Sequence, residues 1–194
     1  MGKNRFEAFS DGVLAIIITI MVLEMKVPHD PSFEALSALA PVFLSYILSF
    51  VYVGIYWNNH HHMLHTVHRV SGAMLWANLH LLFWLSLLPF ATGWLGENHF
   101  APLPTALYGV VLLMASIAYM ILQRLIIAAD GEQAVLKQAI GDDWKGKISP
   151  IAYAFGIAVS LRWHWLAQIL YTLVALMWLI PDRRIERVLP GQAV

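Results

Sequence analysis

The stretch "RFEAFSDGVLAIIITIMVLEM", residues 5–25, decides the fold. Its middle is a run of branched apolar residues that is typical of a membrane helix, but Asp11 and Glu24 place acids near both ends. The 12 residues between these acids carry no charge. As a helix they would span about 18 Å, less than the roughly 30 Å hydrocarbon core of a bilayer. Because charges within a spanning segment usually face protein or water, we expect this helix at the centre of an assembly, with its ends in water.

The composition indicates an integral membrane protein. Of the 194 residues, 59% are hydrophobic and only 12% are charged, against roughly 25% charged in soluble domains. The formal net charge of +0 gives no reason to expect a nucleic-acid partner. The chain has no cysteine, which excludes disulfides, thiolate metal sites and a cysteine nucleophile. No nucleophile–base pair stands out either, so we expect neither an enzyme nor a cofactor.

Six apolar segments divide the chain, and they predict a single all-α domain over residues 1–194 with six transmembrane helices per protomer. The segments are 6–25, 36–63, 72–95, 102–128, 148–161 and 163–180. The polar stretch 130–147 is the sizeable soluble loop of this plan. The last two segments look like a hairpin around "RWHW", where Trp163 and Trp165 fit an aromatic belt at the membrane interface.

The distribution of lysine and arginine predicts the orientation. With the N-terminus in the cytoplasm, ten of these residues lie inside: Lys3, Arg5, Arg69, Arg124, Lys137, Lys145, Lys147, Arg183, Arg184 and Arg187. Only Lys26 and Arg162 then lie outside. The positive-inside rule favours this arrangement. We therefore expect a multi-pass protein of the inner (plasma) membrane with both termini in the cytoplasm.

The first segment carries an apolar stripe at helical spacing. Gly12, Ile16, Thr19 and Leu23 follow the pattern i, i+4, i+7, i+11, and Ile20 extends the same face. If this face lines a central axis, its branched side chains form rings of alkyl groups. Such rings can stop ions by excluding water, so the stripe predicts a hydrophobic gate.

The signature "R-x-x-x-F-S-D" at Arg5, Phe9, Ser10 and Asp11 resembles that of the transmembrane protein 175 family, potassium-permeable channels of endolysosomes and bacteria. "YWNNHH" at 56–61 and "ANLHLLFWLSLLPFATGWLG" at 77–96 resemble the family's second and third helices. The resemblance is specific over the first three segments and generic over the last three. A single six-helix unit resembles the bacterial branch, which implies a homotetramer assembled around a central pore.

The resemblance also implies roles for particular residues. The first helix of each subunit would line the pore, with the constriction at Ile16, further layers at Ile20 and Leu23, and a contribution to selectivity from Thr19. A bracing network would join the signature to the second helix through Arg5, Phe9, Ser10, Asp11, Trp57, His60 and His61. The expected partners are potassium ions and the lipid bilayer.

A histidine cluster follows in "WNNHHHMLHTVHRV", at His60, His61, His62, His65 and His68. His61, His65 and His68 share a helical face, so they could bind zinc, relay protons or sense pH. They could also face water where the helix leaves the membrane, or brace the signature as the resemblance implies. No carboxylate falls within the run, and we expect no metal site. We expect His80, in the third segment, to join the polar network around the signature.

Two interpretations of Glu24 stand side by side. A ring of four such acids could concentrate cations at the outer pore mouth, or Glu24 could be an interfacial acid that pairs with Lys26 or solvent. For the whole chain, the sequence predicts a passive potassium-permeable cation channel. The alternative is a secondary transporter coupled to protons or metal ions through the histidine cluster, although the chain shows no inverted repeat.

Overall fold

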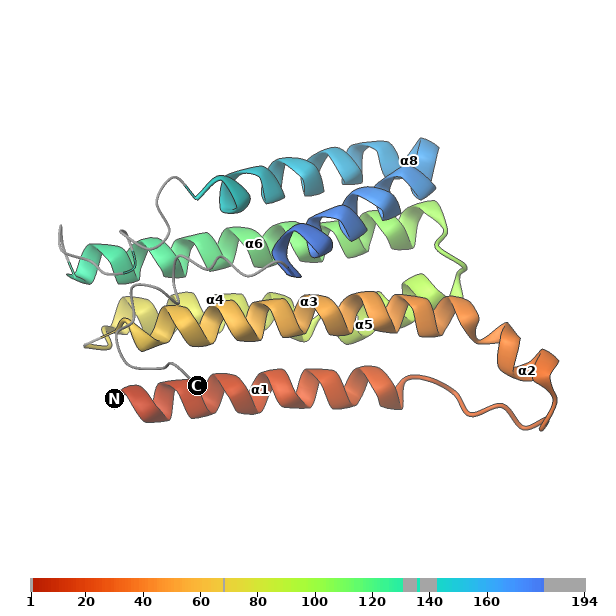
Figure 1. The fold of residues 1–194 in the computed structure, drawn as a ribbon, viewed down its shortest axis with the longest axis horizontal. Helices are drawn as coiled ribbons and strands as arrows, with labels where there is room; N and C mark the ends of the chain where they lie inside the picture. Colours follow the sequence, from red (N-terminus) through yellow and green to blue (C-terminus); the bar gives the residue numbers. More distant parts are fainter. Residues whose placement is uncertain (1, 68, 131–135, 137–142, 180–194) are drawn as a thin grey trace.

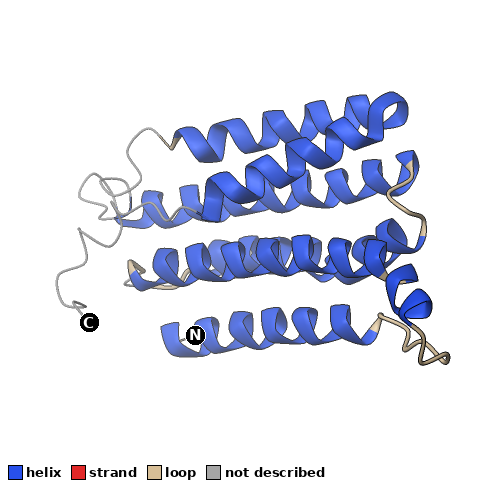
Figure 2. Ribbon diagram, turned by 45° about the vertical axis from the view of Figure 1, so that its right-hand side comes forward, coloured by secondary structure: helices blue, strands red, loops and turns tan. Residues whose placement is uncertain are grey.

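The computed structural model describes residues 2–67, 69–130, 136 and 143–179, and in these ranges the chain is helical with no strand (Figures 1 and 2). The helices are α1 (Lys3–Leu23), α2 (Phe33–Ala38), α3 (Ala40–His65), α4 (Gly72–Ser86), α5 (Leu88–Glu97), α6 (Pro102–Asp130) and α8 (Trp144–Leu179). The all-α fold class predicted from the sequence is confirmed.

Four stretches in the described ranges are long and apolar enough to cross a membrane: Lys3–Leu23, Ala40–His65, Gly72–Glu97 and Pro102–Ala129. They correspond to the first four predicted segments. The third of them comprises α4 and α5, which are separated only at Leu87, where the chain remains close to helical geometry (φ −85°, ψ −10°). Pro89 is the second residue of α5, in the first turn, where its missing N–H costs no hydrogen bond within that helix.

One boundary differs from the predicted segments, and the predicted hairpin of the last two segments is present. The second segment was expected to begin at residue 36, but residues 33–38 form the separate helix α2, whose start is capped by the Ser32 hydroxyl. The fifth and sixth segments form the two arms of α8. At Trp163 the backbone leaves the helical region (φ −135°, ψ 66°) and the chain reverses, as Figure 1 shows. Most of the polar stretch 130–147 lies outside the described residues.

The helices form three layers, with α1 at one edge (Figure 1). Helix α1 packs against α3, α4 and α5, while α6 and α8 lie on the far side of that middle layer. Only one face of α1 is therefore covered by its own protomer. The start of α1, the end of α3, the end of α6 and the start of α8 lie at one end of the bundle (Figure 1), and these segments contain or adjoin the predicted inside residues Lys3, Arg5, Arg69, Arg124, Lys145 and Lys147. Lys26 follows the end of α1, and Arg162 directly precedes the bend of α8 at Trp163, at the other end. Lys137, Arg183, Arg184 and Arg187 are outside the described residues.

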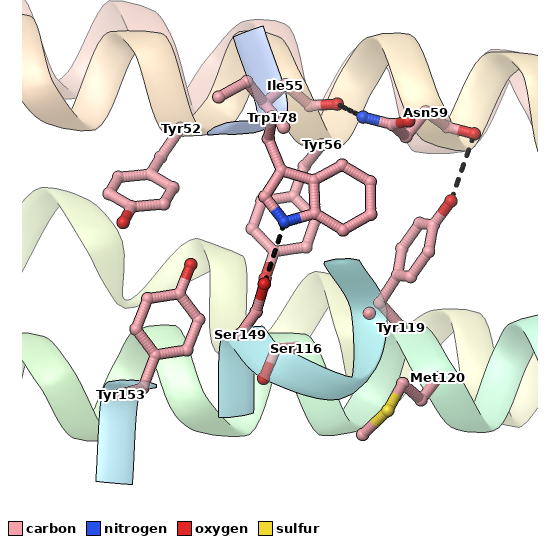
Figure 3. Close-up of a pocket in the computed structure, with 11 residues that line it drawn as sticks. Tyr52, Ile55, Tyr56, Asn59, Ser116, Tyr119, Met120, Ser149, Tyr153 and Trp178 are labelled. Atoms are coloured by element: carbon pink, nitrogen blue, oxygen red, sulfur yellow. Dashed lines mark hydrogen bonds between the residues drawn. The ribbon is translucent and has the colours of Figure 1, made fainter. Parts of the chain in front are cut away.

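Helices α6 and α8 pack closely because small residues meet a large one. The ring of Tyr171 lies against Gly109 and Gly156, and a Cβ atom at either glycine would overlap it. Nearby, a cavity of about 40 Å³ is lined by aromatic rings and a few polar groups from α3, α6 and α8 (Figure 3). Trp178 Nε1 donates to Ser149 Oγ at 2.9 Å on its wall. This cavity lies between α3, α6 and α8, and its lining residues include none from α1.

Candidate functional site

The two faces of α1 have different surroundings. Its buried side chains recur every three or four residues, as expected for one face of a helix: Phe6, Ser10, Leu14, Ile17 and Met21. The opposite face carries the predicted stripe, and its apolar members are exposed in the protomer: Ile16 by 58%, Ile20 by 40% and Leu23 by 78%. Gly12 and Thr19 are exposed on the same face. This stripe is therefore free to contact lipid, water or another copy of the chain.

The one hydroxyl of the stripe has its proton satisfied within the helix. Thr19 Oγ1 donates to the carbonyl oxygen of Ile16 at 2.8 Å. The proton therefore points back along α1, and the oxygen lone pairs are left to accept a hydrogen bond or to contact a cation.

A buried chain of hydrogen bonds fixes the other face of α1. Asn78 Nδ2 on α4 donates to Ser10 Oγ at 2.9 Å, and Ser10 Oγ donates to the carbonyl oxygen of Phe6 at 3.0 Å. His60 Nε2 on α3 lies 2.7 Å from Asn78 Oδ1. Because Oδ1 can only accept, this nitrogen must carry the proton. Ser10, His60 and Asn78 are all buried, so this series of hydrogen bonds joins three helices out of contact with water.

A second set of contacts runs along the antiparallel seam between α1 and α3. Trp57 Nε1 donates to Asp11 Oδ1 at 3.1 Å, and Lys3 Nζ donates to the carbonyl oxygen of His65 at 2.8 Å. Two turns separate these contacts on each helix. Between them, the ring of His61 stacks on Trp57 with centroids 6.1 Å apart. The seam therefore pairs successive turns of α1 with successive turns of α3.

The predicted bracing network is divided by this geometry. Ser10 and His60 meet through Asn78, and Asp11 meets Trp57, which stacks on His61. Arg5 and Phe9 stay apart from both groups. They are exposed on the stripe side of α1, and Arg5 makes no hydrogen bond or ion pair to another described residue. At 100° per residue, positions 5 and 9 point away from position 10, so they cannot share its partners.

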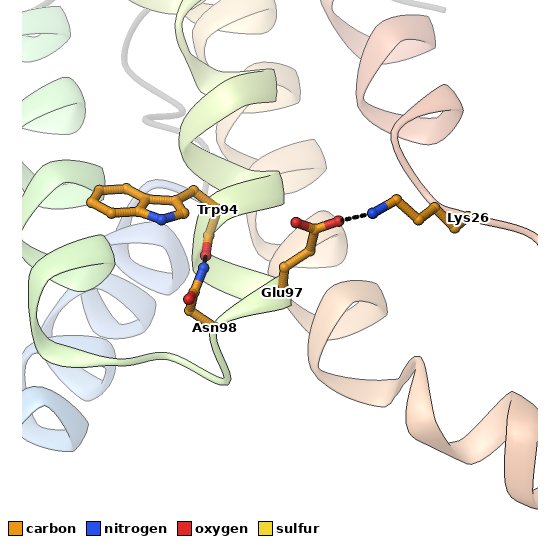
Figure 4. A network of polar contacts seen from close by, with 4 residues as sticks. All are labelled: Lys26, Trp94, Glu97 and Asn98. Atoms are coloured by element: carbon orange, nitrogen blue, oxygen red, sulfur yellow. Dashed lines mark hydrogen bonds and ion pairs between the residues drawn. The ribbon is translucent and has the colours of Figure 1, made fainter.

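Two polar expectations need correction. His80 does not join the network, since its Nε2 accepts from Trp84 Nε1 at 2.9 Å on its own helix. Lys26 does not pair with Glu24. Its Nζ lies 2.7 Å from Glu97 Oε1 on α5 (Figure 4), and the hydrogen bond and charge of Glu97 raise the pKa of Lys26. Glu24 itself is exposed directly after α1.

The histidine face holds a group that the sequence did not indicate. One ligand atom each of Glu7, His61 and His65 lie within 4.8 Å of one another, whereas His68 lies outside the described residues. Glu7 was missed because it belongs to α1 and not to the histidine run. Asn78 was noted only within the resemblance of the third helix. The available signals were a carboxylate four residues before Asp11 and an amide inside a largely apolar helix.

Taken together, these features define a membrane protein with several spans. Its edge helix α1 leaves an apolar stripe uncovered on one face and is attached to the neighbouring helices by hydrogen bonds on the other. A family model described as "Endosomal/lysosomal potassium channel TMEM175" matches residues 5–89. A protein of Chryseobacterium sp. (strain P1-3), named as a potassium channel, is 59% identical over 187 residues, which cover 96% of this chain and 97% of that protein. The chain belongs to the TMEM175 family, a family of ion channels and not of enzymes.

Two further comparisons bear on the fold and on the animal relatives. A solved structure titled as a lysosomal potassium-selective channel TMEM175 homolog from Chamaesiphon minutus is 28% identical, with a TM-score of 0.77, covering 93% of this chain and 97% of that one. The human protein named "Endosomal/lysosomal proton channel TMEM175" is 38% identical over 103 residues, which cover 47% of this chain and 20% of the human one.

Proposed function

We propose that this chain forms a potassium-permeable cation channel in the inner (plasma) membrane, with a pore lined by α1. The proposal rests on family membership, on bacterial relatives named as potassium channels, and on one structural observation. Helix α1 lies at the edge of the protomer and turns the stripe from Gly12 to Leu23 away from it. A pore helix in a symmetric assembly needs such an uncovered face.

The channel is a homotetramer in this proposal. One helix, about 10 Å across with its side chains, cannot enclose a path for ions, so several copies must contribute α1. Each protomer spans the membrane six times, with the two arms of α8 as the last two spans. Both termini lie in the cytoplasm, as the charge distribution favours.

The constriction is formed by Ile16, with further layers at Ile20 and Leu23. Their side chains offer an ion no ligand in exchange for its hydration shell, so a narrow ring of them holds water poorly and closes the pore. Thr19 lies between these layers and keeps oxygen lone pairs free, which makes it the selectivity residue of the proposal. Glu24, exposed at the end of α1, forms a ring of carboxylates at the outer mouth.

The histidine-coupled transporter is less well supported. The buried His60 has its Nε2 engaged with Asn78, an arrangement suited to bracing more than to carrying protons. Protons deserve a test as permeant ions nonetheless, because the animal relatives are named as proton channels.

Flux through liposomes tests the proposal. Purified protein should carry K⁺ down its gradient in the absence of any second gradient, and faster than it carries Na⁺ or H⁺. Native mass measurement should give four chains. Flux that requires a coupling gradient, or full activity of a monomer, contradicts the proposal.

A further inference from the structure

The middle turn of the α1–α3 seam brings together Glu7, His61 and His65. Each offers one ligand atom, and these atoms all lie within 4.8 Å of one another. The rings of His61 and His65 pack edge to face, with centroids 4.4 Å apart. Two imidazoles one turn apart on α3 therefore converge on a carboxylate from another helix. The contacts on either side, Trp57 to Asp11 and Lys3 to the His65 carbonyl, hold the two helices in this register.

The carboxylate has an oxygen that the protein leaves unsatisfied. Glu7 Oε1 is buried and has no hydrogen-bond partner among the described residues. No ion pair among these residues neutralises Glu7 either, because Lys3 Nζ donates to the His65 carbonyl and the ion pair found joins Lys26 to Glu97. A buried polar atom without a partner is unfavourable, and each such atom in a native protein calls for an explanation.

The geometry points to a binding site for a divalent transition-metal cation of the Zn²⁺ type, held by Glu7, His61 and His65. Two imidazole nitrogens and one carboxylate oxygen form a ligand set that Zn²⁺ accepts readily. In a tetrahedral zinc site, ligands at about 2.1 Å from the metal lie about 3.4 Å apart, so the three atoms need to approach one another by roughly 1.4 Å at most. The fourth position is left to water.

The site is open to the surroundings of the bundle and can adjust its shape. His65 is exposed, and it is the last residue of α3. Its ring can therefore rotate toward an arriving ion, while Glu7 and His61 are half-buried. Mg²⁺ is a poor occupant, because it prefers an octahedral shell of oxygen ligands.

A bound metal would join α1 to α3 at a place where the protein itself makes no direct hydrogen bond between these side chains. A metal that fixes α1 against α3 is expected to reduce channel flux. That effect rests on the proposed function, whereas metal binding itself does not, and the two are measured separately.

Metal binding is tested on the full chain purified in detergent, stripped with a chelator and titrated with Zn²⁺. The wild type should bind one Zn²⁺ per protomer, with Mg²⁺ unable to compete, and Zn²⁺ should raise its thermal unfolding temperature. Glu7→Gln and His65→Asn should each weaken binding by about tenfold or more, since each removes a direct ligand. The change at His65 leaves in place the carbonyl that Lys3 uses, and this exposed position tolerates substitution.

The matched controls remove a histidine and a carboxylate elsewhere. Asn fits the positive φ of His99 (49°), and Glu34 is exposed on α2, so His99→Asn and Glu34→Gln should bind Zn²⁺ like the wild type. Absence of Zn²⁺ binding by the folded wild type overturns the proposal. So does equal binding by the wild type and the Glu7→Gln and His65→Asn variants. Binding with unchanged liposome flux supports the site and rejects only its effect on the channel.

Discussion

Replacing Ile16 with asparagine should raise cation flux at little cost in stability. The Ile16 side chain is 58% exposed in the protomer, so the change removes few contacts, and surface substitutions of this kind usually alter stability by about 0.5 kcal/mol or less. In the proposed pore, asparagine offers hydrogen bonds to water in the constriction. One such bond contributes about 1 kcal/mol net, so a single bond gained at the barrier corresponds to roughly a fivefold rise in flux, and a ring of four to more.

The same change at Ile17 should lower stability and leave cation flux without a gain. Ile17 is only 3% exposed and packs against the middle layer, so an asparagine there loses apolar contacts and buries an amide. Such a change costs about 2–5 kcal/mol. We therefore expect lower yield and a lower unfolding temperature, without a gain in flux per assembled channel.

A third variant tests whether the effect at Ile16 comes from its position on the proposed pore face or only from its exposure in the protomer. Val22 is 43% exposed on α1 but lies about 120° around the helix from Ile16. Val22→Asn should leave both stability and flux close to those of the wild type. K⁺ and Na⁺ flux is measured in liposomes at equal amounts of assembled protein, and Ile16→Asn should also narrow the difference between the two ions. Equal flux increases at Ile16 and Val22 reject the assigned pore face, and an unchanged flux at Ile16 rejects it as the gate.

Three further changes test how the protomer is held together. Asn78→Ala leaves the buried Ser10 on α1 and His60 on α3 without their partner and should lower the free energy of unfolding in detergent by about 1–3 kcal/mol. The control Leu79→Ala changes the adjacent, exposed residue and should cost clearly less. Gly109→Ala places a methyl group against the Tyr171 ring and should cost about 1–3 kcal/mol, seen as a lower unfolding temperature. Lys26→Gln should change the free energy of unfolding little, because the ion pair between Lys26 and Glu97 is exposed. Since this pair raises the pKa of Lys26, any stability that it contributes is present at neutral pH and is lost only as the pH rises through that raised pKa.

Helical periodicity was sufficient to predict which residues of α1 share a face. Ile16, Ile20 and Leu23 lie together because 100° per residue is a local property of the helix, and the structure leaves that face exposed. Their role in a pore is a separate matter, because it depends on how protomers assemble. The first four spans were likewise readable from length and composition, since membrane helices need about 20 apolar residues whatever their neighbours are.

Contacts between helices were beyond the reach of the sequence, and His80 shows the reason. Asn78 and His80 are two residues apart, so their side chains point about 160° apart around the axis of α4. Once Asn78 faces Ser10, His80 must face elsewhere, and it bonds to Trp84. The rotation of α4 about its axis decides between the two, and that rotation comes from packing. Glu7 was missed for the same reason, because its histidine neighbours lie more than 50 residues away along the chain.

The contacts of α1 divide it into two halves with different physical attachments. Hydrogen bonds donated by Lys3 and accepted by Ser10 and Asp11 fix the first half to α3 and α4. The second half is held by apolar packing of Leu14, Ile17 and Met21, apart from a long contact of 3.9 Å from the Thr92 hydroxyl to Met21 Sδ. Directional bonds set one geometry, whereas apolar packing is non-directional.

It follows that changes in the first half should act on assembly and changes in the second half on permeation. Asp11→Ala removes the acceptor of Trp57 Nε1 and one anchor of the seam. Because that side chain is half-buried, the loss is about 1 kcal/mol per protomer, and in the proposed tetramer it is repeated in each of the four copies. We expect a lower yield of assembled channel by gel filtration, with the K⁺ to Na⁺ ratio of the remaining channels unchanged. Normal assembly with an altered ratio of K⁺ to Na⁺ flux would place Asp11 in the permeation path. It would also show that holding α1 against α3 is not the role of Asp11.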